Sequence, residues 1–277
     1  MLIKRLIKKI GFKLSNIIIS NNRFAGRIQA AALFRTIPKD KNIRHLDIGS
    51  GTGHISLDLL KKGAKVISLD SSIEKVSIFN SKIKNSSFSS NSYPIVAKGE
   101  ELPFKKETIE LVICNSVLEH TDNDIEIIKE IDTVMKKQGV LAITVPNKEI
   151  RFAQRFQGVW KLLLKLNPSL KRIIFTKKFH NINSISQARF FLESYFNHIH
   201  LYTIESISDT IGDRFEIVSI DYYMQIFGAV SHDLLYSIRG MNYILPKIIM
   251  LFISRLDNIF FRNLNGKGFA IIFKKVR

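Results

Sequence analysis

The stretch HLDIGSGTG, residues 45–53, says most about the fold of this 277-residue chain. A short apolar run containing Asp47 leads into glycines at alternate positions, Gly49, Gly51 and Gly53. Glycine adopts the backbone conformations that a tight turn needs, and the start of a following helix offers unpaired N–H groups and a positive dipole end. The pattern therefore predicts a strand, a glycine turn and a helix that together can bind an anionic part of a cofactor.

The residues after the turn indicate which class of cofactor the turn binds. We expect a helix from His54 to Lys62, closed by Gly63, and then a second apolar run that ends on Asp70. An acidic residue about 20 positions past the glycines, at the tip of the second strand, is placed to hold two ribose hydroxyls. The glycines follow G-x-G-x-G, whereas the dinucleotide fingerprint is G-x-G-x-x-G, so the spacing disfavours a nicotinamide cofactor.

Five motifs in a fixed order relate the chain to a known family. They are HLDIGSGTG (45–53), ISLDSS (67–72), GEELPF (99–104), LVICNSVLEH (111–120) and KKQGVLAITVPN (136–147). With them the chain resembles the class I S-adenosylmethionine-dependent methyltransferases, in particular the branch related to quinone-biosynthesis methyltransferases. The resemblance implies an α/β fold with a doubly wound, seven-stranded, mostly parallel sheet, and S-adenosylmethionine as the cofactor.

The family pattern also implies a cofactor site. The glycine turn would line the methionine end of the cofactor, and Asp47 would orient this turn and approach the methionine amine. Asp70 would bind the ribose diol, while Ser71 and Ile73 would lie near the adenine. The predicted site comprises Asp47, Gly49, Ser50, Gly51, Gly53, Asp70, Ser71, Gly99, Glu100 and Asn115.

One position departs from the family pattern. Where relatives often carry an aspartate that binds the adenine, this chain has Lys98. A lysine side chain has no acceptor for the adenine amino group. Either Glu100 takes over this role or the backbone groups of Gly99 and Glu100 suffice.

The residues after the predicted fourth strand lie where the methyl acceptor is expected. His120 is the candidate base there, because its unperturbed pKa lies near neutral. The alternative is a structural role for Glu119 and His120 at a helix start, whatever the acceptor. Cys114 is expected to be a core thiol. Histidine and cysteine are too scattered along the sequence to predict a metal site, and the chain has no P-loop motif.

Charge divides the chain into three segments. Residues 1–44 hold 11 basic residues and 1 acidic residue, residues 45–150 hold 13 and 15, and residues 151–277 hold 18 and 8. We expect a basic amphipathic helical segment at 1–42, a cofactor-binding core at 43–150, and a lid and substrate region at 151–277. The excess positive charge therefore lies in the flanks, where a partner or substrate would bind.

The first flank has the pattern of an amphipathic helix. In residues 1–17, apolar residues recur every three or four positions and lysine and arginine fill the other face. Such a helix can lie in a membrane interface, or it can pack on its own domain with its basic face in solvent. A signal peptide is less expected, because the charges are spread through the apolar segment.

The second flank allows several interpretations. The family resemblance implies that residues 151–200, after the fifth strand, form a lid over the acceptor. Their mixture of aromatic and basic side chains also suits an RNA-stacking surface or an ordinary solvated helix face. Further on, Thr203 and Gly212 are expected to begin and end a helix, and Gly268 to Lys274 to form the last strand. An apolar insertion at about 224–265 either packs on the core or faces a membrane.

Together these features predict a methyltransferase that acts on oxygen or carbon of a small or lipid-linked acceptor at an anionic membrane surface. An RNA methyltransferase and a non-catalytic adaptor with the same fold are the alternatives. The single cysteine excludes an internal disulfide framework and suits a reducing compartment, so we expect a cytoplasmic location, peripheral to the inner face of the membrane. No stretch reaches the roughly 18 uninterrupted apolar residues of a membrane span.

Overall fold

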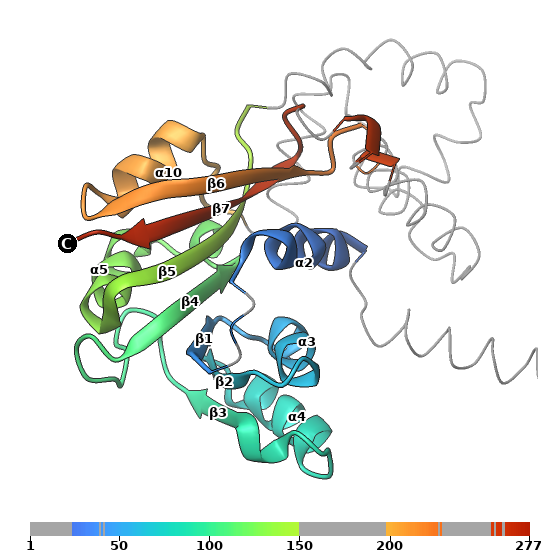
Figure 1. The fold of residues 1–277 in the computed structure, drawn as a ribbon, viewed down its shortest axis with the longest axis vertical. Coiled ribbons are helices and arrows are strands. Elements are labelled where there is room, and N and C mark those ends of the chain that lie inside the picture. Colours follow the sequence, from blue (N-terminus) through green and yellow to red (C-terminus); the bar gives the residue numbers. More distant parts are fainter. Residues whose placement is uncertain are drawn as a thin grey trace, which may run out of the picture.

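A computed structural model describes residues 24–38, 40, 42–149, 198–226, 228, 256–257, 259–261 and 264–277. Its centre is a sheet of seven strands (Figure 1). The strands are β1 (Arg44–Ile48), β2 (Lys65–Asp70), β3 (Ser92–Val96), β4 (Ile109–Asn115), β5 (Met135–Pro146), β6 (Phe215–Tyr223) and β7 (Gly268–Lys275). The predicted second and last strands are confirmed to within a residue at each end.

The strand order in the sheet is β3-β2-β1-β4-β5-β7-β6. The first five strands of this order pair in parallel, and β7 runs antiparallel to both β5 and β6. The chain moves outward from β1 to β3 and then returns to place β4 beside β1. In such sheets ligands bind at the carboxyl ends of the strands where the order reverses, so the ends of β1 and β4 mark the expected site.

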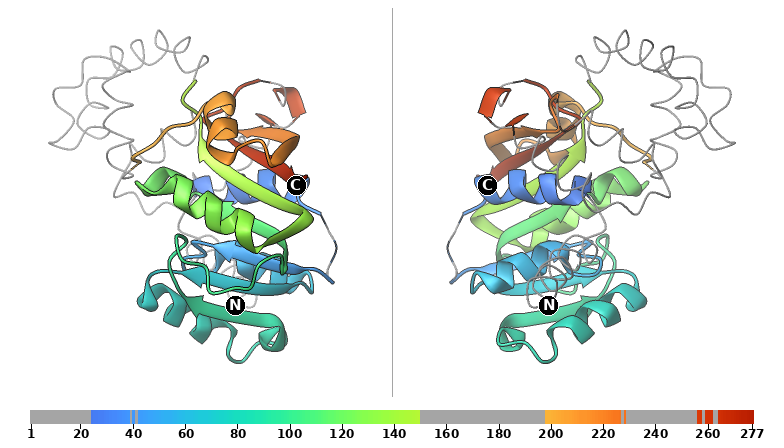
Figure 2. Two further views of the ribbon diagram at one scale, coloured as in Figure 1. Left: turned by 90° about the vertical axis from the view of Figure 1, so that its left-hand side faces the viewer. Right: turned by 90° about the vertical axis from the view of Figure 1, so that its right-hand side faces the viewer.

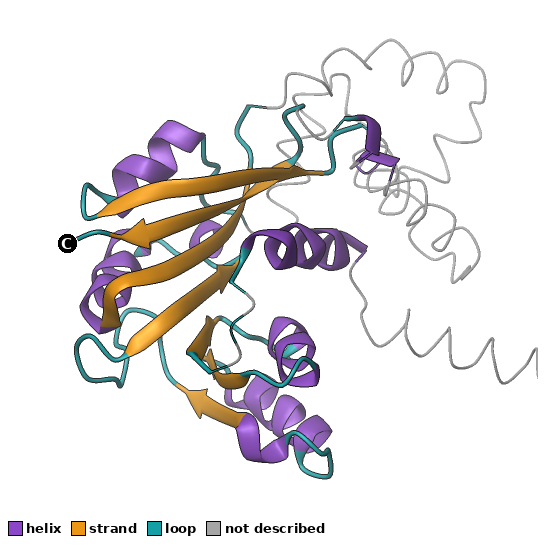
Figure 3. Cartoon of the chain, in the orientation of Figure 1, coloured by secondary structure: helices purple, strands orange, loops and turns teal. Residues whose placement is uncertain are grey.

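Helices cover both faces of the sheet, as the secondary-structure colouring of Figure 3 shows. They are α2 (Phe24–Thr36), α3 (His54–Lys61), α4 (Ile73–Ile83), α5 (Asp124–Val134) and α10 (Ile204–Ile211), with short 3-10 helices η1 (Ser89–Asn91) and η2 (Leu118–His120). The side views in Figure 2 show the yellow-green α5 in front of the sheet from one side and the blue α2 from the other.

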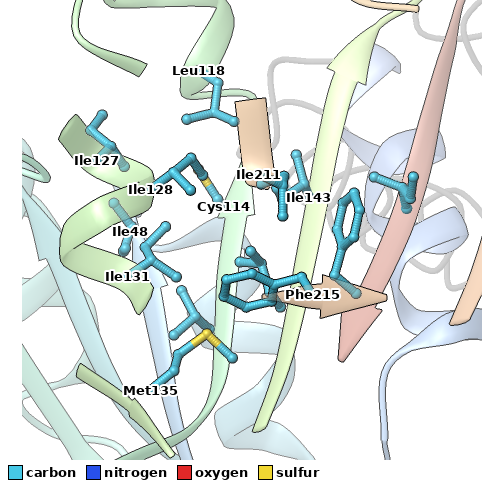
Figure 4. Close-up of a cluster of buried hydrophobic side chains, with 14 of the residues drawn as sticks. Ile48, Cys114, Leu118, Ile127, Ile128, Ile131, Met135, Ile143, Ile211 and Phe215 are labelled. Carbon is cyan, nitrogen blue, oxygen red and sulfur yellow. The ribbon is translucent and has the colours of Figure 1, made fainter. Parts of the chain in front are cut away.

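Each face has its own apolar core because side chains alternate along a strand. In β4, Val112 and Cys114 belong to the core under α5 and α10, while Leu111 and Ile113 belong to the core under α2, α3 and α4. Figure 4 shows the first core, with the thiol of Cys114 among branched aliphatic side chains. Burial raises the pKa of Cys114 strongly, which agrees with the expected core thiol.

The helix ends follow the local signals in the sequence. Gly63 follows α3 with φ 87°, and Ser72 begins α4 by accepting a hydrogen bond from the backbone of Lys75. Thr203 and Ser206 form a reciprocal capping box at the start of α10, and Gly212 ends that helix. The predicted roles of Gly63, Thr203 and Gly212 are confirmed.

Helix α2 lies within the segment predicted to be helical at 1–42. Its buried Leu33 and Ala30 pack on the sheet, and Arg35 forms an ion pair with the buried Asp221 of β6 at 2.7 Å. The amphipathic stretch at 1–17, the aromatic and basic residues 151–197 and most of the insertion at 224–265 lie outside the described residues. What each of them contacts stays a prediction.

Candidate cofactor and acceptor site

The glycine turn joins β1 to α3 at the carboxyl edge of the sheet. Gly49, Gly51 and Gly53 have φ of 65°, 57° and 81°, a region that L side chains rarely adopt. A Cβ at Gly49 would meet Val117 at 2.4 Å and one at Gly53 would meet the ring of Phe79 at 1.9 Å. Among the described residues, and apart from its two chain neighbours, no atom lies within 4 Å of a Cβ built at Gly51. Two of the glycines thus allow close packing, and the third faces open space that a ligand can fill.

Asp70 links this turn to the end of β2. One carboxylate oxygen accepts a hydrogen bond from the backbone of Gly51 at 2.8 Å, and the other accepts from the backbone of Ser72 at 2.9 Å. The residue is 5% exposed. A carboxylate has about four acceptor positions, so Asp70 can order the turn and still accept hydrogen bonds from a ribose diol. Ser71 and Ile73, expected beside the adenine, are exposed.

Asp47 points into the protein. It is 1% exposed and accepts a 2.6 Å hydrogen bond from the hydroxyl of Ser56, which itself accepts one from Ser68 at 2.7 Å. Burial raises the pKa of Asp47 to about 7, and the charge of Asp70 adds to this rise, against hydrogen bonds from Ser56. These contacts tie β1 to α3 and β2, which supports the role in orienting the turn. Contact with a methionine amine stays a prediction.

The 97–104 loop approaches the same edge. The backbone N–H of Ala97 donates to the Asp70 carbonyl at 3.2 Å, and the Thr121 hydroxyl donates to Glu100 at 3.3 Å. Glu100 is thus joined to the segment after β4, while Lys98 is exposed. A Cβ at Gly99 would meet Ile127 at 3.3 Å, so this glycine lets the loop pack on α5.

The loop after β4 carries a second network, which the sequence analysis missed. Thr144 of β5 donates its hydroxyl hydrogen to the Asn115 side chain at 2.9 Å and accepts from the Ser116 backbone at 3.1 Å. Ser116 has φ 54°, a strained value for a residue with a side chain. Such a network depends on neighbours in the sheet, so no local sequence signal reports it.

Within the described part of the chain, the buried hydroxyl groups of Ser50 and Ser116 at this edge have no hydrogen-bond partner. Buried polar atoms without partners are rare, and each calls for an explanation such as an absent ligand. One lies in the glycine turn and the other follows β4, on either side of the point where the strand order reverses. With the open space at Gly51 and the carboxylate of Asp70, the donor set fits a polar cofactor.

The predicted base, His120, is exposed in η2. Its ring lies 5.0 Å from the ring of His198, centre to centre, and Glu119 beside it is 1% exposed. Tyr202 donates to the Leu118 carbonyl at 3.3 Å and to Asp124 at 2.8 Å, which holds the chain after residue 197 against this loop. His198 and Tyr202 were not among the residues predicted for the site.

The scattered histidines predicted no metal site, yet the fold gathers one candidate set. Glu119, His120 and His198 each place a ligand atom within 4.8 Å of the others. The sequence analysis missed this cluster because His198 is distant from the other two along the chain.

Comparison with known proteins agrees with this geometry. Residues 46–143 match the family model described as a methyltransferase domain. A ubiquinone biosynthesis O-methyltransferase of Pelagibacter ubique is 33% identical over 112 residues, 40% of this chain and 45% of that protein. A ubiquinone/menaquinone biosynthesis C-methyltransferase of Wigglesworthia glossinidia brevipalpis is 35% identical over 101 residues, 35% of this chain and 40% of that protein. The chain thus spans less than half the length of both relatives.

The fold is shared with solved structures at lower identity. A geranyl diphosphate methyltransferase in complex with geranyl diphosphate and sinefungin has a TM-score of 0.56 and 12% identity, over 91% of this chain and 78% of that chain. The ordered motifs, the strand order and the matching domain agree. Residues 46–143 therefore match a methyltransferase domain, and the resemblance of the ordered motifs to the class I S-adenosylmethionine-dependent methyltransferases is confirmed.

Proposed function

We propose that this chain transfers a methyl group from S-adenosylmethionine to an oxygen or carbon atom of a small or lipid-linked acceptor at a membrane surface. The observation that carries the methyltransferase part is the hydrogen bond from Gly51 to Asp70 beside the open space of the glycine turn. This arrangement leaves room for a ligand beside the turn and a carboxylate that can accept hydrogen bonds from a ribose diol. The positive dipole end of α3 favours the cofactor's carboxylate on the same side.

The chain's own residues have separate tasks in this proposal. Gly49, Ser50, Gly51 and Gly53 hold the methionine end, Asp70 holds the ribose, and Ser71, Ile73, Gly99 and Glu100 surround the adenine, with Asn115 beside the loop after β4. When bound, the cofactor supplies an activated methyl group on a sulfonium. The protein then has to orient an acceptor and remove one proton, and His120 is the base proposed for that proton.

The flanks support the acceptor class. Residues 1–44 and 151–277 carry the whole positive excess of the chain and many apolar residues. Where the insertion before β7 is described, Ile259, Phe260 and Leu264 are 70%, 67% and 39% exposed. Basic groups attract an anionic surface and exposed apolar groups enter it. The two relatives described above are named for quinone biosynthesis, so quinone precursors and other isoprenoid lipids are the first acceptors to test.

Within the described residues, no helix is long and apolar enough to cross a membrane.

A transfer experiment tests the proposal. The full chain is incubated with S-adenosylmethionine labelled in the methyl group and a whole-cell extract, and the label is then traced to lipid, RNA, protein and small molecules. We expect label in the lipid or small-molecule fraction. Label in RNA would overturn the acceptor class, and no label together with no cofactor binding by calorimetry would favour the non-catalytic adaptor.

The salt dependence of binding distinguishes RNA from a lipid membrane as the partner. Affinity for RNA falls log-linearly and steeply with ionic strength, because each phosphate contact releases counterions. Binding to lipid that also buries apolar groups persists in part at high salt. Titrations with RNA and with anionic vesicles across a salt series therefore distinguish them.

A further inference from the structure

The first 3-10 helix after β4 and the chain segment that begins at residue 198 place three metal-binding side chains together. We propose that Glu119, His120 and His198 bind one divalent transition-metal ion. This site goes beyond the proposed methyl transfer and does not depend on it. A neutral imidazole has one acceptor nitrogen, so His120 cannot bind an ion and serve as the base for the acceptor proton at the same time.

The three side chains lie close enough together to share one ion. One ligand atom from each of the three side chains lies within 4.8 Å of the other two. Ligands of one metal ion lie about 2.0–2.2 Å from it, so modest rotations of the side chains bring all three into contact with an ion. The histidine rings are inclined by 57°, with their centres 5.0 Å apart, and therefore do not stack face to face.

The backbone keeps these groups at that distance. The N–H of Ile199 donates to the Glu119 carbonyl at 2.7 Å, and the hydroxyl of Tyr202 donates to the Leu118 carbonyl at 3.3 Å. Both bonds join the segment that carries His198 to the helix that carries the other two ligands. The ligand set is thus held by the fold before an ion arrives, which reduces the ordering cost of binding.

The three ligand side chains differ in how deeply they are buried. Glu119 is 1% exposed, His198 is half-buried, and His120 is exposed. A dication would lie next to a carboxylate in surroundings that screen charge weakly, where opposite charges attract more strongly than in water. The exposed imidazole leaves a path for the ion to enter.

The donor types select the ion. Two imidazoles and one carboxylate are typical ligands of zinc and of iron, manganese or cobalt in the divalent state, whereas magnesium and calcium prefer oxygen ligands alone. Three protein ligands leave at least one coordination position for water or another oxygen ligand. The ion would also join η2 to the chain after residue 197.

Calorimetry on the untagged full chain, stripped of metal by a chelator, tests the site. Titrated zinc should bind at about one equivalent, and magnesium in excess should not displace it. His198→Gln should weaken zinc binding at least tenfold. His200→Gln is the matched control: this half-buried histidine lies in the same segment, with its ring 6.1 Å from that of Tyr202, and is outside the cluster. His200→Gln should leave the affinity for zinc unchanged.

Two further measurements distinguish the loss of a metal ligand from misfolding of the variant. Divalent cobalt should give visible absorption bands with the wild-type chain and with His200→Gln that are lost in His198→Gln. Zinc should raise the Tm of the wild-type chain and not that of His198→Gln. Weak, substoichiometric zinc binding, or equal affinity in the two variants, would overturn the site and leave the histidine pair as a ring contact. Calorimetry with S-adenosylmethionine, run separately, shows whether the proposed function fails independently.

Discussion

Two acidic residues at the ends of adjacent strands have different surroundings. Asp70 accepts hydrogen bonds from two backbone N–H groups at the open edge, and Asp47 is enclosed beside the Ser56 hydroxyl. The first is placed to bind a ligand and the second to hold the turn. A third residue, His120, is exposed after β4, where the acceptor is expected.

Asp70→Ala should weaken the binding of S-adenosylmethionine. The change removes a carboxylate that orders Gly51 and is expected to hold the ribose. Hydrogen bonds to a charged group contribute about 1.5–3 kcal/mol each, so affinity should fall roughly 10- to 100-fold or more. Calorimetry measures this, with the exposed Glu74→Ala as control. Unchanged affinity in Asp70→Ala would refute the ribose assignment.

Asp47→Asn should change how stability depends on pH. The pKa of Asp47 is about 7 in the folded chain against an ordinary 3.8, because burial disfavours its charge. Between these values the folded state keeps a proton that the unfolded chain releases, so stability falls as pH rises through this range and then levels off. As pH rises through this range, the free energy of unfolding of the wild-type chain should fall on the order of 1–4 kcal/mol further than that of Asp47→Asn, at about 1.36 kcal/mol per pKa unit.

Urea unfolding of both proteins at pH 5 and pH 8 measures this difference. Glu110 does not interfere: burial would raise its pKa, but bonds from Lys136 and Arg44 outweigh this and lower the pKa to about 2. It is therefore ionised at both pH values. A stability difference between the two proteins that does not vary with pH would mean that Asp47 is already charged at pH 5.

His120→Ala should lower turnover more than cofactor affinity if this residue is the base. General-base catalysis contributes roughly 10²–10⁴-fold to rate. Turnover is followed with labelled cofactor and the acceptor found in the extract experiment, and cofactor affinity by calorimetry. An equal loss in both quantities would assign His120 a structural role at the start of the loop.

At the scale of elements, two glycines of the turn allow close packing against neighbouring side chains, and the third leaves room for a ligand. Gly53 approaches the Phe79 ring of α4, and Gly51 faces open space. The two residues therefore allow a matched pair of substitutions within one turn.

Gly53→Ala should destabilise the fold, because its Cβ would lie 1.9 Å from the Phe79 ring and φ is 81°. Gly51→Ala meets no atom within 4 Å, so it should cost only the left-handed backbone, about 1–2 kcal/mol. Its Cβ fills the proposed cofactor space, so affinity for S-adenosylmethionine should fall. Thermal unfolding and calorimetry measure both effects. Equal cofactor affinity in Gly51→Ala and the wild-type chain would argue against a ligand at this turn.

Local signals were sufficient for most elements. Gly63, Thr203 and Gly212 end or begin helices as expected, because turn and cap chemistry acts within a few residues. The order of motifs also predicted the seven-stranded sheet. The contact of Thr144 with Asn115 and Ser116 was missed, because it joins neighbouring strands that are distant in sequence.

At the scale of the whole molecule, a core of nearly balanced charge lies between two basic flanks. Anionic membranes attract such flanks, with each basic group near the surface contributing about 1 kcal/mol. The described part of the first flank, α2, packs on the sheet. Residues before it are the ones predicted to reach a membrane.

Deletion of residues 1–18 should release the chain from anionic vesicles without changing its Tm. Cosedimentation with vesicles that contain phosphatidylglycerol measures binding, and neutral phosphatidylcholine vesicles serve as control. If the deletion lowers Tm markedly and vesicle binding persists, the segment packs on its own domain.

The sequence by itself determined most of the elements, the glycine turn, the acid at position 70 and the resemblance to a methyltransferase family, because these depend on local backbone chemistry and on spacing along the chain. Only the tertiary structure decided that Asp47 is buried beside Ser56, that the hydroxyls of Ser50 and Ser116 are buried without partners among the described residues, and that His198 joins Glu119 and His120. These relations form when the strand order brings distant segments to one edge of the sheet, and no local pattern records that approach.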